Sequence, residues 1–300
     1  MSHKKAHKAQ NYVLCVPFCG AALVANQLPK RNRPAVCAEE LQRLEQLLRR
    51  EFGGERKFQW SILTTLGLWL NIFTWTQRTQ RLHKSAQAVI FDFDYTLADS
   101  SQGALECINF ALGEMGLEHV SLEAACRTIG LSLHQTFLTL GEHHEAQRCD
   151  EFHRLFVQRA DEVMSRLTVL YEPVPAMVDA LRERGLQLGI VSTKYRRRIQ
   201  QVLEREALLN GFDVVIGGED VAQHKPHPEG LLEAMQRLEC SPDSVVYVGD
   251  SVVDAELAER AGVPLIVVLS GVTPREDFDA YEPIAVLESI ADLPGFFGTL

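Results

Sequence analysis

The sequence predicts an α/β fold, a doubly wound parallel sheet with helices on both faces and an inserted helical segment. Residues 86–92 are a nearly continuous apolar run, which is typical of a strand buried on both faces of a parallel sheet. From residue 171 onward, short apolar runs alternate with amphipathic stretches. This alternation indicates βαβ units with right-handed crossovers. Residues 101–170 contain no strand-like run and are predicted to be helical throughout.

The individual elements follow from the same patterns. After the first strand, we expect further strands at residues 186–191, 212–216, 245–248 and 265–269. The helices between them are expected at residues 173–185, 195–206, 228–238 and 254–261. Within the helical segment, the pattern predicts helices at residues 103–116, 121–129, 134–141 and 145–167.

Charge divides the chain near Ser85. The 300 residues are 46% apolar and 23% charged, as in soluble globular proteins. Residues 1–85 hold 14 Lys and Arg against 5 Asp and Glu, whereas residues 86–300 hold 16 against 35. The larger part is therefore acidic, with a formal charge of −19 against +9 for the smaller. Nucleic acid is not expected as a partner, because phosphate binding depends on basic surface.

Residues 1–85 form an N-terminal extension of unclear role, which we expect to be partly helical or poorly ordered. Its basic start and the apolar residues 12–25 have the outline of a signal peptide, but Pro17 and Gly20 interrupt the run. The apolar stretch from Trp60 to Trp75 has 16 residues, whereas a membrane span needs about 20. Membrane contact through this extension is thus the weaker alternative.

Cysteine usage indicates a reducing compartment. The chain has seven cysteines, an odd number, with wide spacing and no C-x-x-C pair. This distribution favours reduced thiols over a disulfide framework or a zinc site. We therefore expect a cytoplasmic protein, and association with a membrane remains the alternative.

Polar residues follow three of the predicted strands directly. Asp92 and Asp94 end the first strand, Ser192 and Thr193 end the strand at 186–191, and Asp250 ends the strand at 245–248. Asp254 comes four residues after Asp250, so both fall on nearly one side if a helix begins there. In open α/β sheets, ligands bind at the carboxyl ends of the strands. The sequence therefore predicts a site at this edge.

Four stretches in order give a family resemblance over residues 86–300. Asp92-Phe93-Asp94-Tyr95-Thr96, Ser192-Thr193-Lys194, His224-Lys225-Pro226 and Gly249-Asp250 with Asp254 resemble the four motifs of the haloacid dehalogenase superfamily. Residues 217–221 and 268–273 resemble its phosphoglycolate phosphatase-like branch. The resemblance implies a Rossmann-like catalytic core from residues 86–100 and 171–300. It also implies that residues 101–170 are a helical cap that closes over the active site.

The resemblance implies a covalent mechanism. Asp92 would be the nucleophile and Asp94 the general acid and base, and both chemistries suit carboxylates. Lys225 would neutralise the nucleophile and the phosphoryl group, which is a large catalytic effect in a dry site. Tyr95 stands where the family often has glycine, a departure that leaves the motif intact but alters the turn beside Asp94.

The resemblance also implies a metal and a phosphate site. Mg²⁺ would be held by the Asp92 carboxylate, the Asp94 backbone carbonyl and Asp250, with Asp254 in support. Four carboxylates around one point repel one another without a cation, which is a physical reason to expect the ion. Ser192 and Thr193 would bind the phosphoryl oxygens together with Lys225.

The predicted function is Mg²⁺-dependent hydrolysis of a small phosphorylated metabolite, a phosphoglycolate-like phosphomonoester. A pyrophosphatase and a β-phosphoglucomutase share every motif and stay open as alternatives. Asp94 argues against a dehalogenase, and the lack of lysine in residues 101–170 argues against a phosphonatase. A non-catalytic binding module normally lacks a motif residue, and none is lost here. Arg127 in the cap is the candidate for substrate specificity, and the oligomeric state is left open.

Overall fold

The computed structural model describes residues 85–141 and 146–298. The predictions for a signal peptide and for the Trp60–Trp75 stretch lie outside these residues. Within the described part of the chain, no helix is both long and apolar enough to cross a bilayer.

The described strands of the core form a six-stranded parallel sheet with the order β5-β4-β1-β6-β7-β8. The prediction of an α/β fold with a parallel sheet is therefore confirmed. The strands are β1 (Ala88–Phe91), β4 (Gln187–Val191), β5 (Val214–Ile216), β6 (Val245–Gly249), β7 (Leu265–Val268) and β8 (Ala285–Leu287). The sequence did not predict β8, because it is a three-residue edge strand that is only partly buried.

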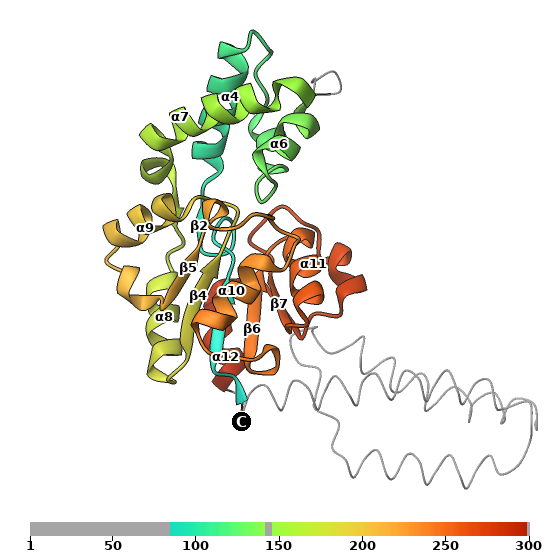
Figure 1. Cartoon of the computed structure of the whole chain (residues 1–300). Coiled ribbons are helices and arrows are strands. Elements are labelled where there is room, and N and C mark those ends of the chain that lie inside the picture. Colours follow the sequence, from blue (N-terminus) through green and yellow to red (C-terminus); the bar gives the residue numbers. More distant parts are fainter. Residues whose placement is uncertain (1–84, 142–145, 299–300) are drawn as a thin grey trace, which may run out of the picture. The chain divides into compact units, whose positions relative to one another are not determined.

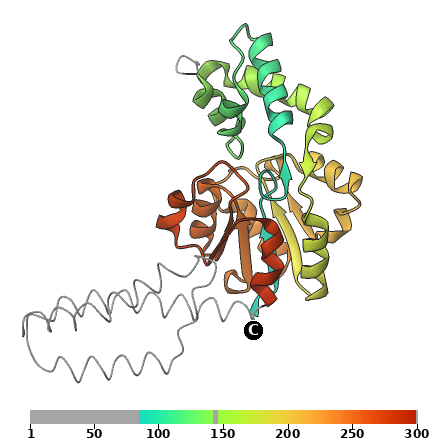
Figure 2. The same cartoon turned by 180° about the vertical axis from the view of Figure 1, so that it is seen from behind.

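Helices cover both faces of the sheet, as Figures 1 and 2 show. One apolar core lies between the sheet and the helices α8 (Val174–Glu183), α9 (Arg196–Arg205) and α12 (Leu293–Gly298). A second core packs α10 (Glu229–Arg237) and α11 (Val252–Ala261) against the opposite face. Strands buried on both sides explain why their sequences are continuous apolar runs rather than alternating ones.

Short 3-10 helices complete the described chain. They are η2 (Ala146–Arg148), η3 (Leu209–Gly211), η4 (Gly218–Asp220), η5 (Pro242–Ser244), η6 (Arg275–Tyr281) and η7 (Ile290–Asp292).

The inserted segment packs around a core of its own. Its helices are α4 (Ser101–Glu114), α5 (Leu122–Cys126), α6 (Leu133–Leu140) and α7 (Cys149–Leu167), drawn in the upper part of Figure 1. Phe137 of α6 and Phe152 of α7 are fully buried and stack with ring centroids 5.0 Å apart. Ser132 and Gln135 form a capping box at the start of α6, a motif that satisfies the free N–H groups of a helix start.

Backbone and side-chain contacts join this segment to the sheet domain. The strands β2 (Ala98–Asp99) and β3 (Val169–Leu170) pair antiparallel at the two crossings of the chain, and the sequence did not predict this short ribbon. The guanidinium of Arg198 in α9 is buried and lies 2.7 Å from Asp161 in α7. The segment is therefore fixed both through its backbone and through a side-chain ion pair.

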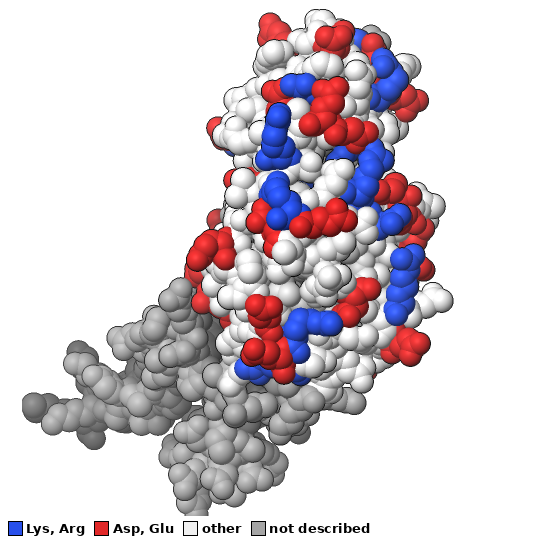
Figure 3. Space-filling model, turned by 90° about the vertical axis from the view of Figure 1, so that its left-hand side faces the viewer, with Lys and Arg blue, Asp and Glu red and all other residues white. Residues whose placement is uncertain are grey.

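Surface charges are interspersed on the face that bears α7 and α9, where Figure 3 shows basic and acidic side chains next to one another. Arg197 pairs with Asp161, and Arg196 pairs with Asp220. This face presents no continuous basic surface. The cysteines of the described residues, Cys107, Cys126, Cys149 and Cys240, are free thiols.

Candidate active site

The site forms where three neighbouring strands end. β1 lies between β4 and β6, and Phe91 is level with both Ile190 and Val248. The residues that follow these strands therefore meet at one edge of the sheet, as the sequence predicts. Asp92, Ser192 and Asp250 are all buried there.

Three carboxylates converge at this edge. Oxygen atoms of Asp92, Asp250 and Asp254 lie within 4.8 Å of one another. The Thr96 hydroxyl donates to Asp250 Oδ1 at 3.0 Å, and the Ser251 hydroxyl donates to Asp254 Oδ2 at 2.6 Å. Both hydroxyls hold a carboxylate in one orientation, so the cluster is preorganised.

Lys225 bridges two of these carboxylates. Its Nζ lies 2.8 Å from Asp92 Oδ1 and 2.8 Å from Asp254 Oδ1, and its side chain is only 5% exposed. Burial on its own lowers the pKa of Lys225, but attraction to Asp254 and Asp92 outweighs burial and raises it. Lys225 is therefore a fixed positive charge beside the predicted nucleophile.

One ammonium does not balance three buried carboxylates. Burial raises the pKa of Asp92 to about 6, although Lys225 opposes the shift. Burial, followed by repulsion from Asp254 and Asp92, raises the pKa of Asp250 well above its ordinary value. Such a cluster gains stability from a further cation. An all-oxygen donor set suits Mg²⁺, so these residues fit the predicted metal.

Gly271 provides the space that Asp250 occupies. A Cβ atom added at Gly271 would lie 2.0 Å from Asp250 Oδ2, which is far inside van der Waals contact. The loop after β7 must therefore have glycine here for Asp250 to keep its place in the cluster.

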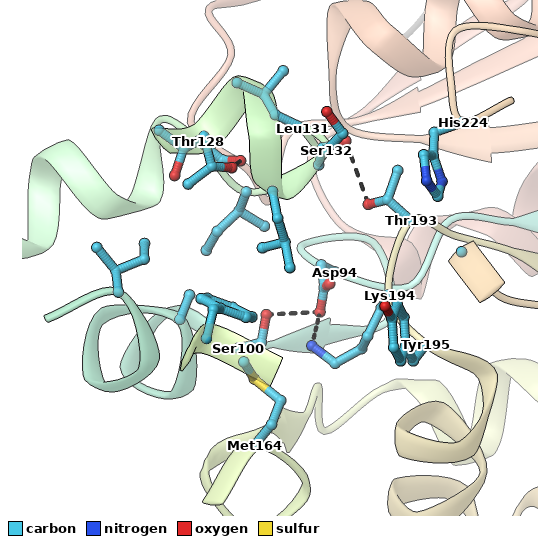
Figure 4. A pocket seen from close by; sticks show the side chains of 18 of the residues that line it. Asp94, Ser100, Thr128, Leu131, Ser132, Met164, Thr193, Lys194, Tyr195 and His224 are labelled. Carbon is cyan, nitrogen blue, oxygen red and sulfur yellow. Dashed lines mark hydrogen bonds and ion pairs between the residues drawn. The ribbon is translucent and has the colours of Figure 1, made fainter. Parts of the chain in front are cut away.

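Asp94 lines a cavity that residues of the helical segment also line. Its Oδ1 accepts a hydrogen bond from the Ser100 hydroxyl at 2.7 Å and another from Lys194 Nζ at 2.8 Å. Figure 4 shows both donors meeting the same carboxylate oxygen. Asp94 is thus oriented through Oδ1.

A cavity of about 310 Å³ lies between Asp94 and the helical segment. Its walls include Thr193, Lys194 and His224 of the sheet domain and the α5–α6 loop at residues 129–133. The Thr193 hydroxyl donates to the Gly130 carbonyl of that loop at 3.4 Å. Thr193 therefore contacts the α5–α6 loop as well as lying next to Ser192, whose Oγ accepts from the Lys194 N–H at 3.3 Å.

Comparison with known proteins agrees with this arrangement. The family model described as haloacid dehalogenase-like hydrolase matches residues 89–268. The chain belongs to the haloacid dehalogenase-like hydrolase family. The matched residues include all four predicted motifs, so the resemblance seen in the sequence is confirmed.

Curated relatives of this hydrolase are phosphatases by name. Pyrophosphatase PpaX of Bacillus velezensis is 31% identical over 210 residues, which cover 70% of this chain and 95% of the relative. Phosphoglycolate phosphatase of Escherichia coli is 30% identical over 228 residues, covering 69% of this chain and 90% of the relative. A haloacid dehalogenase-like hydrolase structure from Bacteroides fragilis is 39% identical with a TM-score of 0.67, covering 69% of this chain and 99% of that one.

Arg127 does not join the active site of this hydrolase. Its side chain is 69% exposed and pairs with Glu123 one turn away on the same helix, and it is not among the residues that line the cavity. The expectation that Arg127 contacts substrate therefore has no support in this geometry. An arginine at a helix end can pair with a carboxylate at position i−4 on the helix surface. Here that pair keeps the Arg127 guanidinium at the surface.

Sequence reasoning also missed a residue. Lys194 is buried against Asp94, yet the sequence analysis gave it no role. Its position offered a signal: it follows Ser192 and Thr193 at the carboxyl end of β4, next to the edge where ligands bind.

Proposed function

We propose that this hydrolase is a Mg²⁺-dependent phosphatase that cleaves a small phosphorylated metabolite through an aspartyl-phosphate intermediate on Asp92. The observation that favours it most is the position of Lys225, whose ammonium lies 2.8 Å from both Asp92 and Asp254. A buried cation at a nucleophilic carboxylate offsets the charge of an approaching phosphoryl group.

In the first half of the reaction, a carboxylate oxygen of Asp92 attacks phosphorus and the bond to the leaving oxygen breaks. Asp94 donates a proton to that oxygen, so the leaving oxygen departs as a hydroxyl group. In the second half, Asp94 removes a proton from water as the water attacks phosphorus. The acyl-phosphate bond breaks, which regenerates Asp92 and releases phosphate.

The carboxylates of Asp92 and Asp250 and the backbone carbonyl of Asp94 would hold Mg²⁺, with Asp254 in support. When bound, the ion would neutralise charge on the phosphoryl oxygens. Ser192 and Thr193 would bind those oxygens through hydroxyl and backbone N–H groups. Thr193 would do so while keeping its contact with Gly130 of the cap loop.

The domain roles belong to the same proposal. Residues 86–100 and 171–300 would be the catalytic core, and residues 101–170 would be the cap that excludes water and contacts the leaving group. The cavity between Asp94 and residues 129–133 supports this assignment, because the leaving group must lie on the side of its proton donor.

Two other activities use the same machinery. Pyrophosphate hydrolysis is supported by the relative named pyrophosphatase, at 31% identity. A β-phosphoglucomutase would transfer the phosphoryl group from Asp92 back to a sugar rather than to water. A binding module without activity is disfavoured, because the contacts of Asp92, Asp94 and Lys225 are all in place.

A phosphate-release screen tests the proposal. Purified full-length protein with Mg²⁺ is incubated with 2-phosphoglycolate, pyrophosphate, β-glucose 1-phosphate and a panel of other phosphorylated metabolites. We expect catalytic release of phosphate from one compound or a narrow group. Isomerisation of the sugar phosphate without net phosphate release would identify a mutase instead. No turnover of any compound by folded protein would contradict the proposal.

A further inference from the structure

The cavity beside Asp94 is enclosed by groups that favour negative charge. Among the described residues that line it, Asp94 is the only acidic one. The basic residues of the lining are Lys194, Arg198, His134, His153 and His224. A neutral leaving group would not require this imbalance, whereas an anionic one would be attracted by it.

Most of these groups are engaged elsewhere. The guanidinium of Arg198 binds the Asp161 carboxylate and the Val157 carbonyl. His153 Nε2 lies 3.2 Å from the Tyr195 hydroxyl, and His134 lies 3.1 Å from Asp150. Among these basic residues, Lys194 is therefore the buried cation that lies next to Asp94.

Lys194 retains donors for a ligand. An ammonium has three N–H groups, and the hydrogen bond of Nζ within the described residues goes to Asp94 Oδ1, at 2.8 Å. The Lys194 side chain is 5% exposed, so bulk water has little access to its remaining N–H groups. Figure 4 shows the Lys194 amine next to the Asp94 carboxylate.

We propose that Lys194 binds an anionic group on the leaving-group half of the substrate, and that it thereby determines which phosphorylated compounds this enzyme accepts. The inference rests on the proposed phosphatase function. Because Asp94 must reach the leaving oxygen while it is held by Lys194, the anion must lie within a few bonds of that oxygen. A carboxylate or a second phosphoryl group attached close to the ester oxygen meets this requirement.

Ser100 is a matched control, because it separates substrate binding from a purely orienting role. Ser100 and Lys194 donate to the same oxygen of Asp94, but Ser100 brings no charge. If Lys194 only orients Asp94, losing either donor impairs all substrates of similar leaving-group basicity alike. If Lys194 also binds the substrate, its loss selectively impairs anionic leaving groups.

The experiment compares Lys194→Met and Ser100→Ala with wild type on 2-phosphoglycolate, pyrophosphate and 2-hydroxyethyl phosphate. The first and third are alkyl esters of similar size, and only the first has a carboxylate. For Lys194→Met, we expect kcat/KM to fall roughly ten- to a hundredfold further on an anionic substrate than on 2-hydroxyethyl phosphate, as for the loss of a charged hydrogen bond. For Ser100→Ala, the ratio between substrates should stay at its wild-type value. A selective loss on 2-phosphoglycolate identifies a carboxylate, and one on pyrophosphate identifies a second phosphoryl group.

Binding provides a readout that survives loss of turnover. In an Asp92→Asn background, calorimetric titration should show that Lys194→Met weakens the binding of 2-phosphoglycolate or pyrophosphate by about tenfold or more, and that of 2-hydroxyethyl phosphate much less. Equal weakening or equal kinetic loss on all three compounds would overturn the inference and leave the phosphatase function standing. Wild-type enzyme that neither binds nor hydrolyses any phosphate ester would overturn both.

Discussion

The ammonium nitrogen of Lys225 lies 2.8 Å from Asp254 Oδ1, an oxygen that also accepts the Tyr247 hydroxyl at 3.0 Å. Asp254 is thereby fixed from two sides, and it fixes Lys225 in turn. The same ammonium reaches Asp92, so the orientation of the proposed nucleophile depends on a carboxylate 162 residues away in the sequence. The carboxylate cluster is consequently one cooperative unit rather than a set of independent ligands.

Replacing Asp92 separates chemistry from stability. Asp92→Asn should abolish phosphate release, because an amide of nearly the same shape is not nucleophilic. The burial that raises the pKa of Asp92 to about 6 disfavours its charged form, so the neutral variant should melt at a higher temperature than wild type without metal at pH 7. Phosphate release and thermal melting measure the two effects. A variant with a tenth of wild-type turnover would refute the covalent mechanism.

The carboxylate cluster should make metal-free stability depend on pH. The pKa of Asp92 rises from 3.8 to about 6 on burial, and that of Asp250 is raised in the same direction. The folded state thus holds protons that the unfolded chain releases, so stability should fall as pH rises through 3.8 to about 6 and beyond. Mg²⁺ should reduce this loss by taking the place of the protons.

Melting curves in EDTA and in Mg²⁺, measured between pH 5 and 7.5, test this linkage. Asp250→Asn should flatten the pH dependence in EDTA and should raise the Mg²⁺ concentration needed for activity. Full activity in excess EDTA, or a metal-free protein that becomes steadily more stable up to pH 7.5, would rule out the assigned cluster.

The sequence predicted correctly that the residues after three strands meet at one edge of the sheet. Asp92, Ser192 and Asp250 each end an apolar run, and parallel strands bring such ends together whatever the details of packing. Lys225 was found only through the family resemblance, because nothing local indicates that this lysine turns inward between two carboxylates.

Arg127 and Lys194 show which information sequence patterns lack. Arg127 and Lys194 are both cations next to a loop, and the sequence favoured Arg127 because it lies in the cap. The structure buries Lys194 against Asp94 and leaves Arg127 paired with Glu123 at the surface. Which of two cations is buried depends on a tertiary partner, here Asp94 at a separation of 100 residues, and no helical or strand period encodes that contact.

Gly271 should be essential for metal binding although it offers no side chain. In Gly271→Ala, the new methyl group would lie 2.0 Å from Asp250 Oδ2, so the carboxylate must move away from Asp92. We expect a higher Mg²⁺ requirement and at least tenfold lower turnover at limiting Mg²⁺. Gly295→Ala is the control, since a Cβ there meets no neighbouring atom of the described residues within 4 Å. Unchanged Mg²⁺ dependence of Gly271→Ala would contradict the placement of Asp250.

Removing residues 1–84 should spare catalysis, because every motif lies downstream. A protein that starts at Ser85 keeps the backbone bonds that attach the start of β1, from Gln87 N to the Ser244 carbonyl and from Gln187 N to the Gln87 carbonyl. Steady-state kinetics on a substrate of the full chain should give the same kcat/KM within about twofold. A truncated protein that folds but does not turn over that substrate would refute this boundary.

Tyr95 occupies a backbone conformation that normally favours glycine. Its φ is +61°, in the left-handed region that costs a residue with a side chain about 1 kcal/mol or more. The surrounding turn enforces this φ, since Tyr95 N donates to the Ala98 carbonyl at 2.7 Å and the Ser270 hydroxyl donates to the Tyr95 carbonyl. Tyr95 as a residue is only 7% exposed, so burial of its side chain offsets the backbone cost.

Two substitutions separate the backbone cost from the contribution of the ring. Tyr95→Ala loses the buried ring and keeps the strain, so it should lower the free energy of unfolding by about 3–5 kcal/mol, as for other large buried rings. Tyr95→Gly loses the same ring but relieves the strain, so it should be about 1 kcal/mol more stable than Tyr95→Ala. Urea unfolding of both variants measures the difference. At an ordinary position alanine would be the more stable of the two, and that order here would show that Tyr95 is not held in the left-handed region.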